Sequence, residues 1–234
     1  MTQIINEISH YFIVQLQDMG FWEIIQVVGL MLSFIYLLLE FEQKALMWVV
    51  SAMCSMIYAS VYYRSKIYAD MGFSIFNICM CVYGFYKWWT LSQKNIANKT
   101  HNTVSKNRSN ITNKNKEKKE IVYYHFTLPQ FGRVMAVFTL IWTGISFILK
   151  YLTDSPIPAL DALTTTINIV GTWVLAQKII EVWGFWFMVN ILSIYIYYKR
   201  GLHLSTILLY CFYLGASVYG YFKWKRHGIL SHHR

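Results

Sequence analysis

Charged side chains and proline are scarce in this chain of 234 residues. Only 14% of the residues are charged and only three are proline, whereas 56% are hydrophobic and the mean hydropathy is +0.36. A soluble domain has about a quarter charged residues, and a chain of this size cannot bury so much apolar surface in one core. The composition therefore excludes a disordered chain and a collagen-like fibre, and it favours an integral membrane protein.

Sequence signatures of enzymes and metalloproteins are missing as well. The four cysteines (Cys54, Cys79, Cys81 and Cys211) include no C-x-x-C pair and fall within apolar stretches, so we expect reduced, packed thiols. The sequence contains no G-x-S-x-G, P-loop or G-x-G-x-x-G motif. We therefore expect no enzyme activity, no cofactor and no metal.

Seven apolar stretches are each close to the roughly 20 residues that a helix needs to cross a bilayer. They cover residues 21–39, 45–63, 71–89, 131–152, 159–179, 182–198 and 204–224. Residues 93–120 are instead rich in Asn, Lys, Thr and Ser, which is typical of a disordered, solvated linker. Residues 1–19 carry apolar side chains at helical spacing and no Lys or Arg, so an amphipathic helix at the membrane interface or an ordinary packing helix fits equally well.

An internal repeat relates the third stretch to the seventh. The sequence Y-G-F-Y-K-W at residues 83–88 returns as Y-G-Y-F-K-W at residues 219–224, and the same offset pairs Tyr62 with Tyr198. Chance similarity between aromatic-rich helix ends is the alternative explanation. If the repeat is real, stretches one to three and five to seven are two copies of a three-helix unit. Because three helices end on the opposite side of the membrane, one extra helix gives both copies the same orientation, which is a known transporter plan.

The predicted fold class is therefore an all-α membrane protein with seven transmembrane helices. Two parallel three-helix bundles are joined by a linker helix (3+1+3), and an N-terminal amphipathic helix precedes them. The predicted segments are the amphipathic helix 1–19, the first repeat 21–89, a cytoplasmic basic linker 90–130, the linking helix 131–152, the second repeat 159–225 and a cytoplasmic tail 226–234.

The basic residues are distributed unequally between the two sides of this topology. Of the 21 Lys and Arg residues, one side would hold only Arg64, Lys66, Lys150, Lys199 and Arg200, and the other side holds the rest. Cytoplasmic loops carry the excess of positive charge, so we expect the linker and the C-terminus in the cytoplasm and the N-terminus outside. The net charge of +10 is then explained by orientation and anionic lipid, and no nucleic-acid partner is needed.

One string of polar and aromatic residues lies inside the sixth stretch. Trp183, Trp186 and Asn190 form W-x-x-W-x-x-x-N, a spacing that puts all three on one helix face. Two indoles and a carboxamide suit a flat aromatic ligand with hydrogen-bonding groups. A cationic ring would gain about 1–2 kcal/mol from cation–π attraction when desolvated. An interfacial aromatic belt with an interhelical Asn contact is the alternative.

Other candidate binding residues come from the faces of three further stretches. Asn168 and Thr172 share a face of the fifth stretch, Gln177 ends that stretch, Asn77 lies near the middle of the third, and Trp48 lies in the second. No Lys or Arg is deep within a stretch and the acidic residues lie near the ends, whereas ion-coupled transport usually needs a carboxylate at mid-membrane. This pattern predicts an uncoupled facilitator whose substrate is not strongly anionic.

Two weaker polar stripes are explained as well by helix packing as by ligand binding. The residues are Gln26, Ser33, Tyr36 and Glu40 in the first stretch, and Trp48, Ser51, Ser55, Tyr58 and Tyr62 in the second.

The 3+1+3 plan, the string at Trp183, Trp186 and Asn190, and the Y-G-x-x-x-W endings together resemble the PnuC family of bacterial nicotinamide riboside transporters. The resemblance covers residues 21–224 except the linker, and only the three residues of the string carry over by motif. It implies a SWEET-like fold, facilitated diffusion of nicotinamide riboside, and a homotrimer in the bacterial inner membrane. It also implies that a cytoplasmic kinase traps the substrate for NAD biosynthesis.

The first repeat lacks the string, because the repeat offset places Val50 and Cys54 opposite Trp186 and Asn190. We therefore expect asymmetric binding in which the second repeat dominates. A SWEET-type sugar carrier or a transporter of another vitamin such as thiamine is the nearest alternative. A membrane receptor or scaffold that binds a soluble partner through the basic linker is a third.

Overall fold

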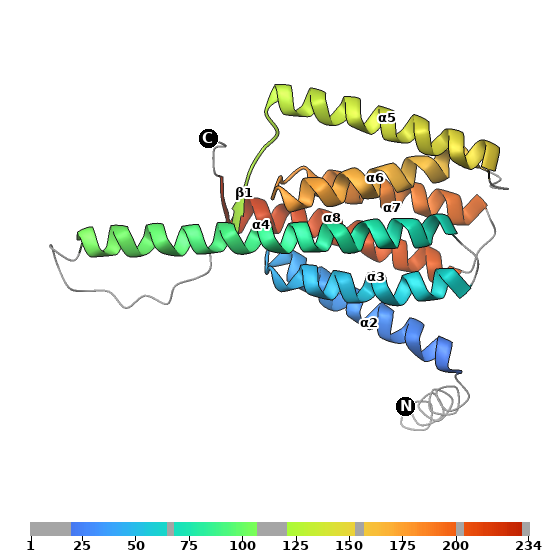
Figure 1. Ribbon diagram of the computed structural model, residues 1–234, viewed down its shortest axis with the longest axis horizontal. Helices are drawn as coiled ribbons and strands as arrows, with labels where there is room; N and C mark the ends of the chain where they lie inside the picture. Colours follow the sequence, from blue (N-terminus) through green and yellow to red (C-terminus); the bar gives the residue numbers. More distant parts are fainter. Residues whose placement is uncertain (1–19, 65–67, 107–120, 153–156, 200–203, 231–234) are drawn as a thin grey trace, which may run out of the picture.

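The computed structural model describes residues 20–64, 68–106, 121–152, 157–199 and 204–230, so the amphipathic helix expected at 1–19 lies outside the described residues. The described part contains seven helices, one for each apolar stretch of the sequence (Figure 1). They are α2 (Phe21–Phe41), α3 (Leu46–Arg64), α4 (Tyr68–Lys106), α5 (Leu128–Leu152), α6 (Pro158–Ala176), α7 (Val182–Lys199) and α8 (Leu204–His227).

Helix α4 differs from the prediction at its C-terminal end. We expected a helix to residue 89 and disorder from residue 93, but α4 continues to Lys106 and projects beyond the other helices (Figure 1). A helix that is already nucleated adds one hydrogen bond per further residue, so residues of good helix propensity such as Lys, Gln and Ala can prolong it without a hydrophobic face. The solvated linker is therefore helical in its first part, and residues 107–120 are not described.

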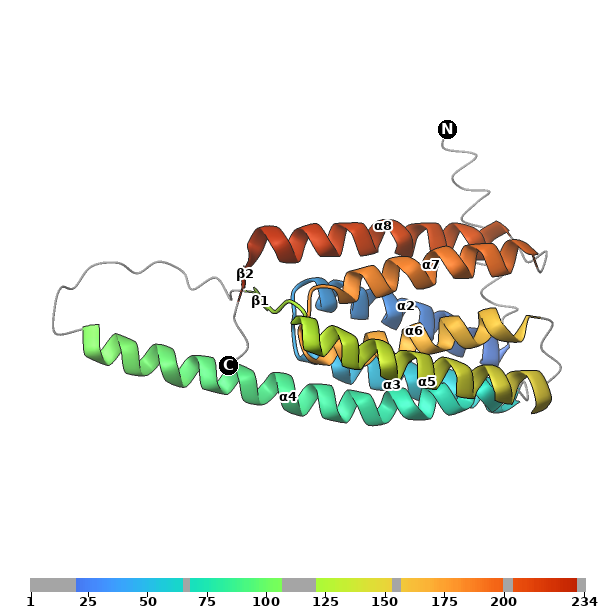
Figure 2. The ribbon, with the colours of Figure 1, turned by 90° about the horizontal axis from the view of Figure 1, so that it is seen from above.

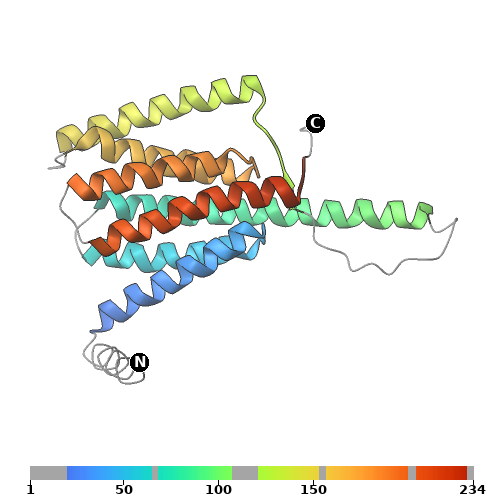
Figure 3. The same ribbon diagram turned by 180° about the vertical axis from the view of Figure 1, so that it is seen from behind.

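The helices pack in two sets of three. Helix α3 packs against both α2 and α4, and α7 packs against both α6 and α8. Contacts between α4 and α6 and between α2 and α8 join the two sets into a ring, whereas α5 lies outside the ring against α6 (Figures 1 and 2). Helices α2, α4, α6 and α8 run in one direction and α3, α5 and α7 in the other (Figure 3).

The two copies of the repeat make the same close contact between an indole and a glycine. A Cβ atom on Gly84 would lie 2.4 Å from the ring of Trp48, and one on Gly220 would lie 2.3 Å from the ring of Trp183. Both indoles are almost completely buried, at 1% and 2% exposure. Only glycine lets the α4 and α8 backbones approach the rings so closely, which explains why the repeated motif contains glycine.

The motif tryptophans bind the two sets of helices to each other. Trp88 meets Trp48 edge to face with ring centroids 5.7 Å apart, and Trp224 meets Trp183 in the same way at 5.4 Å. The Trp88 Nε1–H donates to the carbonyl of Ala176 at the end of α6 (3.1 Å), and the Trp224 Nε1–H donates to the carbonyl of Glu40 at the end of α2 (3.3 Å). Each indole thus satisfies a terminal helix carbonyl in the other set.

A short two-stranded sheet accompanies the seven helices of the all-α fold. Strand β1 (Ile121–Tyr123) pairs in parallel with β2 (Gly228–Leu230), and the next residue, Tyr124, exchanges backbone hydrogen bonds with Lys178 and Ile180. The Val122 N–H donates to the side chain of Gln43 in the α2–α3 loop. Three-residue strands give little sequence signal, and only the tertiary structure brings the segment before α5 beside the tail after α8.

The outer surface of the bundle is strongly apolar. Leu140, Val82 and Phe222 are 73%, 69% and 62% exposed, and many other large apolar side chains also face outward. By length and composition, α3, α5 and α6 can cross a membrane, and α2 and α7 contain shorter apolar segments. Such a continuous exposed apolar surface needs lipid around it, so the bundle is a membrane protein.

Candidate functional site

Trp186 links the two sets of helices inside the ring. Its Nε1–H donates a hydrogen bond of 2.8 Å from α7 to the Oε1 of Glu40 on α2. The Trp186 ring also lies against Gly171 of α6, where a Cβ atom would come within 2.9 Å of it. The Glu40 side chain is only 2% exposed. A carboxylate this deeply buried needs hydrogen bonds or a counter-charge, so the pair is a strong candidate for a functional contact.

A polar cavity opens next to this pair between α2, α3 and α4. Its volume is about 240 Å³ and its lining includes Tyr36, which lies one helical turn before Glu40. Asn77 of α4 projects into the same region, and its Nδ2 donates to Ser55 Oγ at 2.8 Å and to Ser51 Oγ at 3.2 Å. The hydroxyls and carboxamide form a group that can bond the hydroxyls or amide of a small polar ligand.

Asn190 lies about one helical turn further along α7 than Trp186 and bonds within its own set of helices. It is buried, and its Nδ2 donates to Ser217 Oγ of α8 at 3.3 Å, while the Ser217 hydroxyl donates to the carbonyl of Tyr213. Of the string found in the sequence, Trp186 and Asn190 therefore meet different partners on different helices.

Trp183 and Trp48, the other two aromatic candidates, occupy packing positions. Trp183 stacks on Phe41 with centroids 5.6 Å apart and packs against Gly220. Trp48 packs against Gly84 in the equivalent position. Among the described residues, neither indole Nε1–H has a hydrogen-bond partner. Both rings lie in the core that holds the helices together.

The remaining candidates lie along α6 and at its end. The Thr172 hydroxyl donates to the carbonyl of Asn168 within the helix, at 2.8 Å, and the Asn168 side chain is half-buried. Gln177 bonds away from Trp186, because its Oε1 accepts from Lys87 and its Nε2 donates to the Tyr83 hydroxyl at 3.1 Å, both on α4. The structure thus separates Gln177 from the Trp186–Glu40 pair.

The structure also corrects the register of the repeat on α3 and α7. Because Trp48 and Trp183 make the same contact, they are equivalent, and counting onward places Ser51 and Ser55 opposite Trp186 and Asn190. The offset of the helix-end motifs had placed Val50 and Cys54 there. The positive-φ residues of the two loops, Gln43 before α3 and Lys178 before α7, are separated by the same offset as the two tryptophans.

Sequence reasoning assigned no binding role to Glu40, Tyr36, Ser51 and Ser55, since the two stripes that contain them were equally consistent with helix packing. The sequence signal that could have indicated a binding role was Glu40, a carboxylate at the end of an apolar stretch and on the same helix face as Tyr36. The tertiary fold shows that the stripes face each other and Asn77. Across the described residues, no group of three His, Cys, Asp or Glu side chains could hold a metal ion.

Comparisons with known proteins point to a family of transporters. The model of the nicotinamide mononucleotide transporter family matches residues 23–226. The nicotinamide riboside transporter PnuC of Neisseria mucosa is 28% identical over 180 residues, which cover 73% of this chain and 62% of that relative. The chain thus spans less than two thirds of that relative's length. The crystal structure of the vitamin B3 transporter PnuC matches 95% of this chain and 89% of its own with a TM-score of 0.65 at 22% identity, which shows a shared fold.

Proposed function

The chain belongs to the nicotinamide mononucleotide transporter family of PnuC proteins, and on that basis we propose that it carries nicotinamide riboside across the membrane. The relative from Neisseria mucosa is named for this substrate, although the alignment covers only part of it. The single structural observation that carries the proposal is the buried Trp186–Glu40 pair beside a cavity of hydroxyl and carboxamide groups.

The chemistry of the pair suits the chemistry of the riboside. The pyridinium ring of nicotinamide riboside is flat and positively charged, so it can stack on the Trp186 indole while the Glu40 carboxylate balances its charge. The ribose hydroxyls and the carboxamide need donors and acceptors, which Asn77, Ser51 and Ser55 supply. A phosphate on the ribose would add negative charge near Glu40, so the phosphorylated riboside would bind poorly.

The other candidate residues take supporting roles in this proposal. Asn190 and Asn168 offer amide groups from α7 and α6, and Thr172 holds the helix turn beneath Asn168. Trp183 and Trp48 position the neighbouring helices through their contacts with glycine, so their part in binding would be indirect.

Transport would proceed by alternating access without coupling to an ion. We propose two parallel three-helix bundles, α2–α4 and α6–α8, that rock about the central site while α5 connects them. The Trp186–Glu40 hydrogen bond joins the bundles, and a bound cation that competes for the carboxylate would weaken this link. Binding energy would thereby favour the conformational change.

The cellular setting follows from the proposed topology. The chain would cross the bacterial inner membrane seven times, with the N-terminus outside and with the linker and C-terminus in the cytoplasm. Four basic residues lie at the bundle end next to β1, the end that would face the cytoplasm. Lys178 bonds Tyr124 just after β1, Lys87 bonds Gln177, and Arg133 and Lys223 lie in the first turns of α5 and the last turns of α8. A cytoplasmic kinase would trap the riboside for NAD biosynthesis, and the transporter would act as a homotrimer.

Calorimetric titration of the purified protein tests the proposal. Nicotinamide riboside should bind, whereas its phosphorylated form, thiamine and glucose should bind at least about tenfold more weakly, which corresponds to about 1.4 kcal/mol. Trp186→Ala should abolish binding. Trp142→Ala is the matched control. Trp142 lies on α5 and donates its indole N–H to the carbonyl of Ala159 on α6, so its loss should leave riboside binding unchanged. Equal binding of glucose, or an undiminished affinity in Trp186→Ala, would contradict the proposal.

A further inference from the structure

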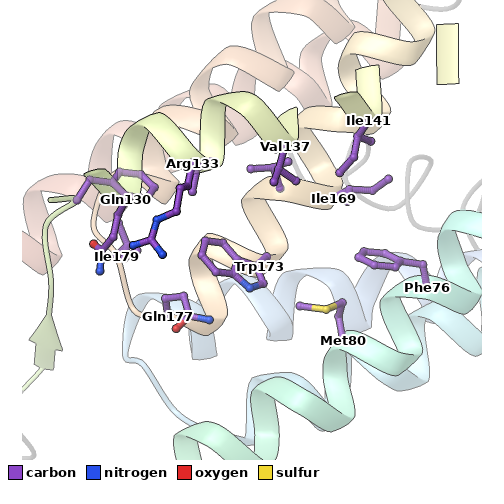
Figure 4. A pocket seen from close by; sticks show the side chains of 13 residues that line it. Phe76, Met80, Gln130, Arg133, Val137, Ile141, Ile169, Trp173, Gln177 and Ile179 are labelled. Carbon is purple, nitrogen blue, oxygen red and sulfur yellow. The ribbon is translucent and has the colours of Figure 1, made fainter. Parts of the chain in front are cut away.

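A second cavity lies outside the ring, between α4, α5 and α6 (Figure 4). Its volume is about 590 Å³, larger than that of the polar cavity. The walls are apolar, with Phe76 and Met80 from α4, Val137 and Ile141 from α5, and Ile169 and Trp173 from α6. We refer to this cavity as the α5 groove. None of its lining residues is among Glu40, Trp186 and Asn77, so it is separate from the proposed substrate site.

The α5 groove is polar at one end only. Gln130 and Arg133 from α5 and Gln177 from the end of α6 lie there, and the Arg133 guanidinium points from α5 toward α6 (Figure 4). The Arg133 Nε–H donates to the carbonyl of Pro129 at 3.3 Å, which uses one of its five donors. Of the described residues that line the groove, none is acidic, so its charge calls for an anionic ligand.

The dimensions of the groove match the depth of a membrane leaflet. The eleven helical steps from Gln130 to Ile141 span roughly 16 Å, about half of the 30 Å hydrocarbon core. Helix α5 is long and apolar enough to cross the membrane, and most of its residues face outward while one side packs on α6. The groove therefore runs from the charged membrane surface toward the bilayer centre, with its polar end at the surface.

From this arrangement we propose that the α5 groove binds an anionic phospholipid. One acyl chain lies along Val137, Ile141 and Trp173, and the phosphate accepts hydrogen bonds from the Arg133 guanidinium, which suits phosphate geometry. Lys87, which bonds Gln177 at the same end, adds a second positive charge close to the headgroup. The lipid fills the space between α5 and the ring and so couples the linking helix to α4 and α6.

Native mass spectrometry of the purified full chain tests this assignment with two lipids of identical acyl chains. Phosphatidylglycerol should bind roughly five- to tenfold more tightly than phosphatidylcholine, with one molecule retained per chain. Arg133→Gln should remove this preference. Lys225→Gln is the control, because Lys225 is exposed at the same end of the bundle on α8 and does not line the groove. It should keep the preference.

Two further variants distinguish lipid binding in the groove from attraction to general surface charge and from misfolding. Val137→Phe fills the apolar part, so it should weaken both lipids, and Arg133→Lys keeps the charge and should retain part of the preference. Each variant is checked for unchanged riboside binding. Equal binding of both lipids by the unchanged chain, or equal losses in Arg133→Gln and Lys225→Gln, would overturn the proposal. Dissociation of an oligomer by Val137→Phe with no loss of lipid would assign the groove to a second copy of the chain instead.

Discussion

Gly220→Ala should destabilise the bundle more than the same substitution at Gly215, the other glycine of α8. The new Cβ atom would lie 2.3 Å from the Trp183 ring, whereas ordinary contacts begin at 3.4 Å. The ring or the helix would have to move by about 1 Å. Trp183 cannot move easily, because it is 2% exposed and is held by Phe41 and Trp224 at centroid distances of 5.6 and 5.4 Å.

Gly215→Ala is the matched control on the same helix. No atom lies within 4 Å of the Cβ position at Gly215, so that substitution gains only helix propensity, about 0.8–1.0 kcal/mol. Gly220→Ala gains the same propensity and loses about 1–3 kcal/mol to overpacking. The gain cancels in the comparison, so the two variants should differ by about 1–3 kcal/mol in the free energy of unfolding. For a chain of this length the corresponding difference in Tm is about 2–12 °C.

Thermal unfolding of the purified variants in one detergent, followed by circular dichroism, measures this difference. In the Gly220→Ala background, Trp183→Phe should recover part of the loss, because a smaller ring leaves space for the methyl group. The repeat makes the same prediction for Gly84→Ala, whose Cβ atom would meet Trp48 at 2.4 Å. If Gly220→Ala were as stable as Gly215→Ala, the packing role assigned to Trp183 would be refuted.

Three further predictions concern the site and the link between the bundles. Glu40→Gln should lower the affinity for cationic nicotinamide riboside at least about fivefold, because unit charges 4 Å apart interact by about 1–4 kcal/mol. The affinity for the uncharged dihydro form should not change. Equal losses of affinity for the two forms, measured by calorimetry, would refute the charge role. Asn77→Ala should lower riboside affinity by roughly three- to tenfold through lost hydrogen bonds, with uptake into liposomes as the readout. Trp88→Phe and Trp224→Phe each remove one hydrogen bond between the bundles and leave a smaller ring in a fully buried position. Each should therefore lower stability by at least about 0.5–1.5 kcal/mol in chemical unfolding, and an unchanged midpoint would show that the bonds do not contribute.

The positions of the helices could be predicted closely because they depend on local composition. A stretch of apolar residues about 20 long predicts a helix that can cross the membrane, whatever its neighbours. Helix α7 begins at Val182 and α8 at Leu204, as predicted, and α5 ends at Leu152. The end of α4 was missed, because a polar sequence does not by itself distinguish a solvated helix from a disordered linker.

The candidate site could be predicted only in part. Trp186, Asn190 and Asn77 are polar or aromatic residues on particular helix faces, so helical spacing is enough to nominate them. Glu40 and Ser55 gain their significance from residues far away in the chain: Glu40 bonds Trp186, and Ser55 bonds Asn77. Trp183 shares a helix face with Trp186, yet it packs on Gly220, because a face 100° wide can meet two different neighbours.

The sequence by itself determined that the chain is a membrane protein and roughly where its helices lie, and it suggested a repeat, because hydropathy and motif spacing are properties of contiguous residues. Only the tertiary structure decided how the repeats are aligned, that Trp48 and Trp183 pack against glycine, and that a buried carboxylate faces Trp186. Gly84 and Gly220 fix the packing within each set, because they let α4 and α8 approach the rings of Trp48 and Trp183. The packing between the sets depends on residues far apart in the chain, such as Glu40 and Trp186, which no local pattern relates.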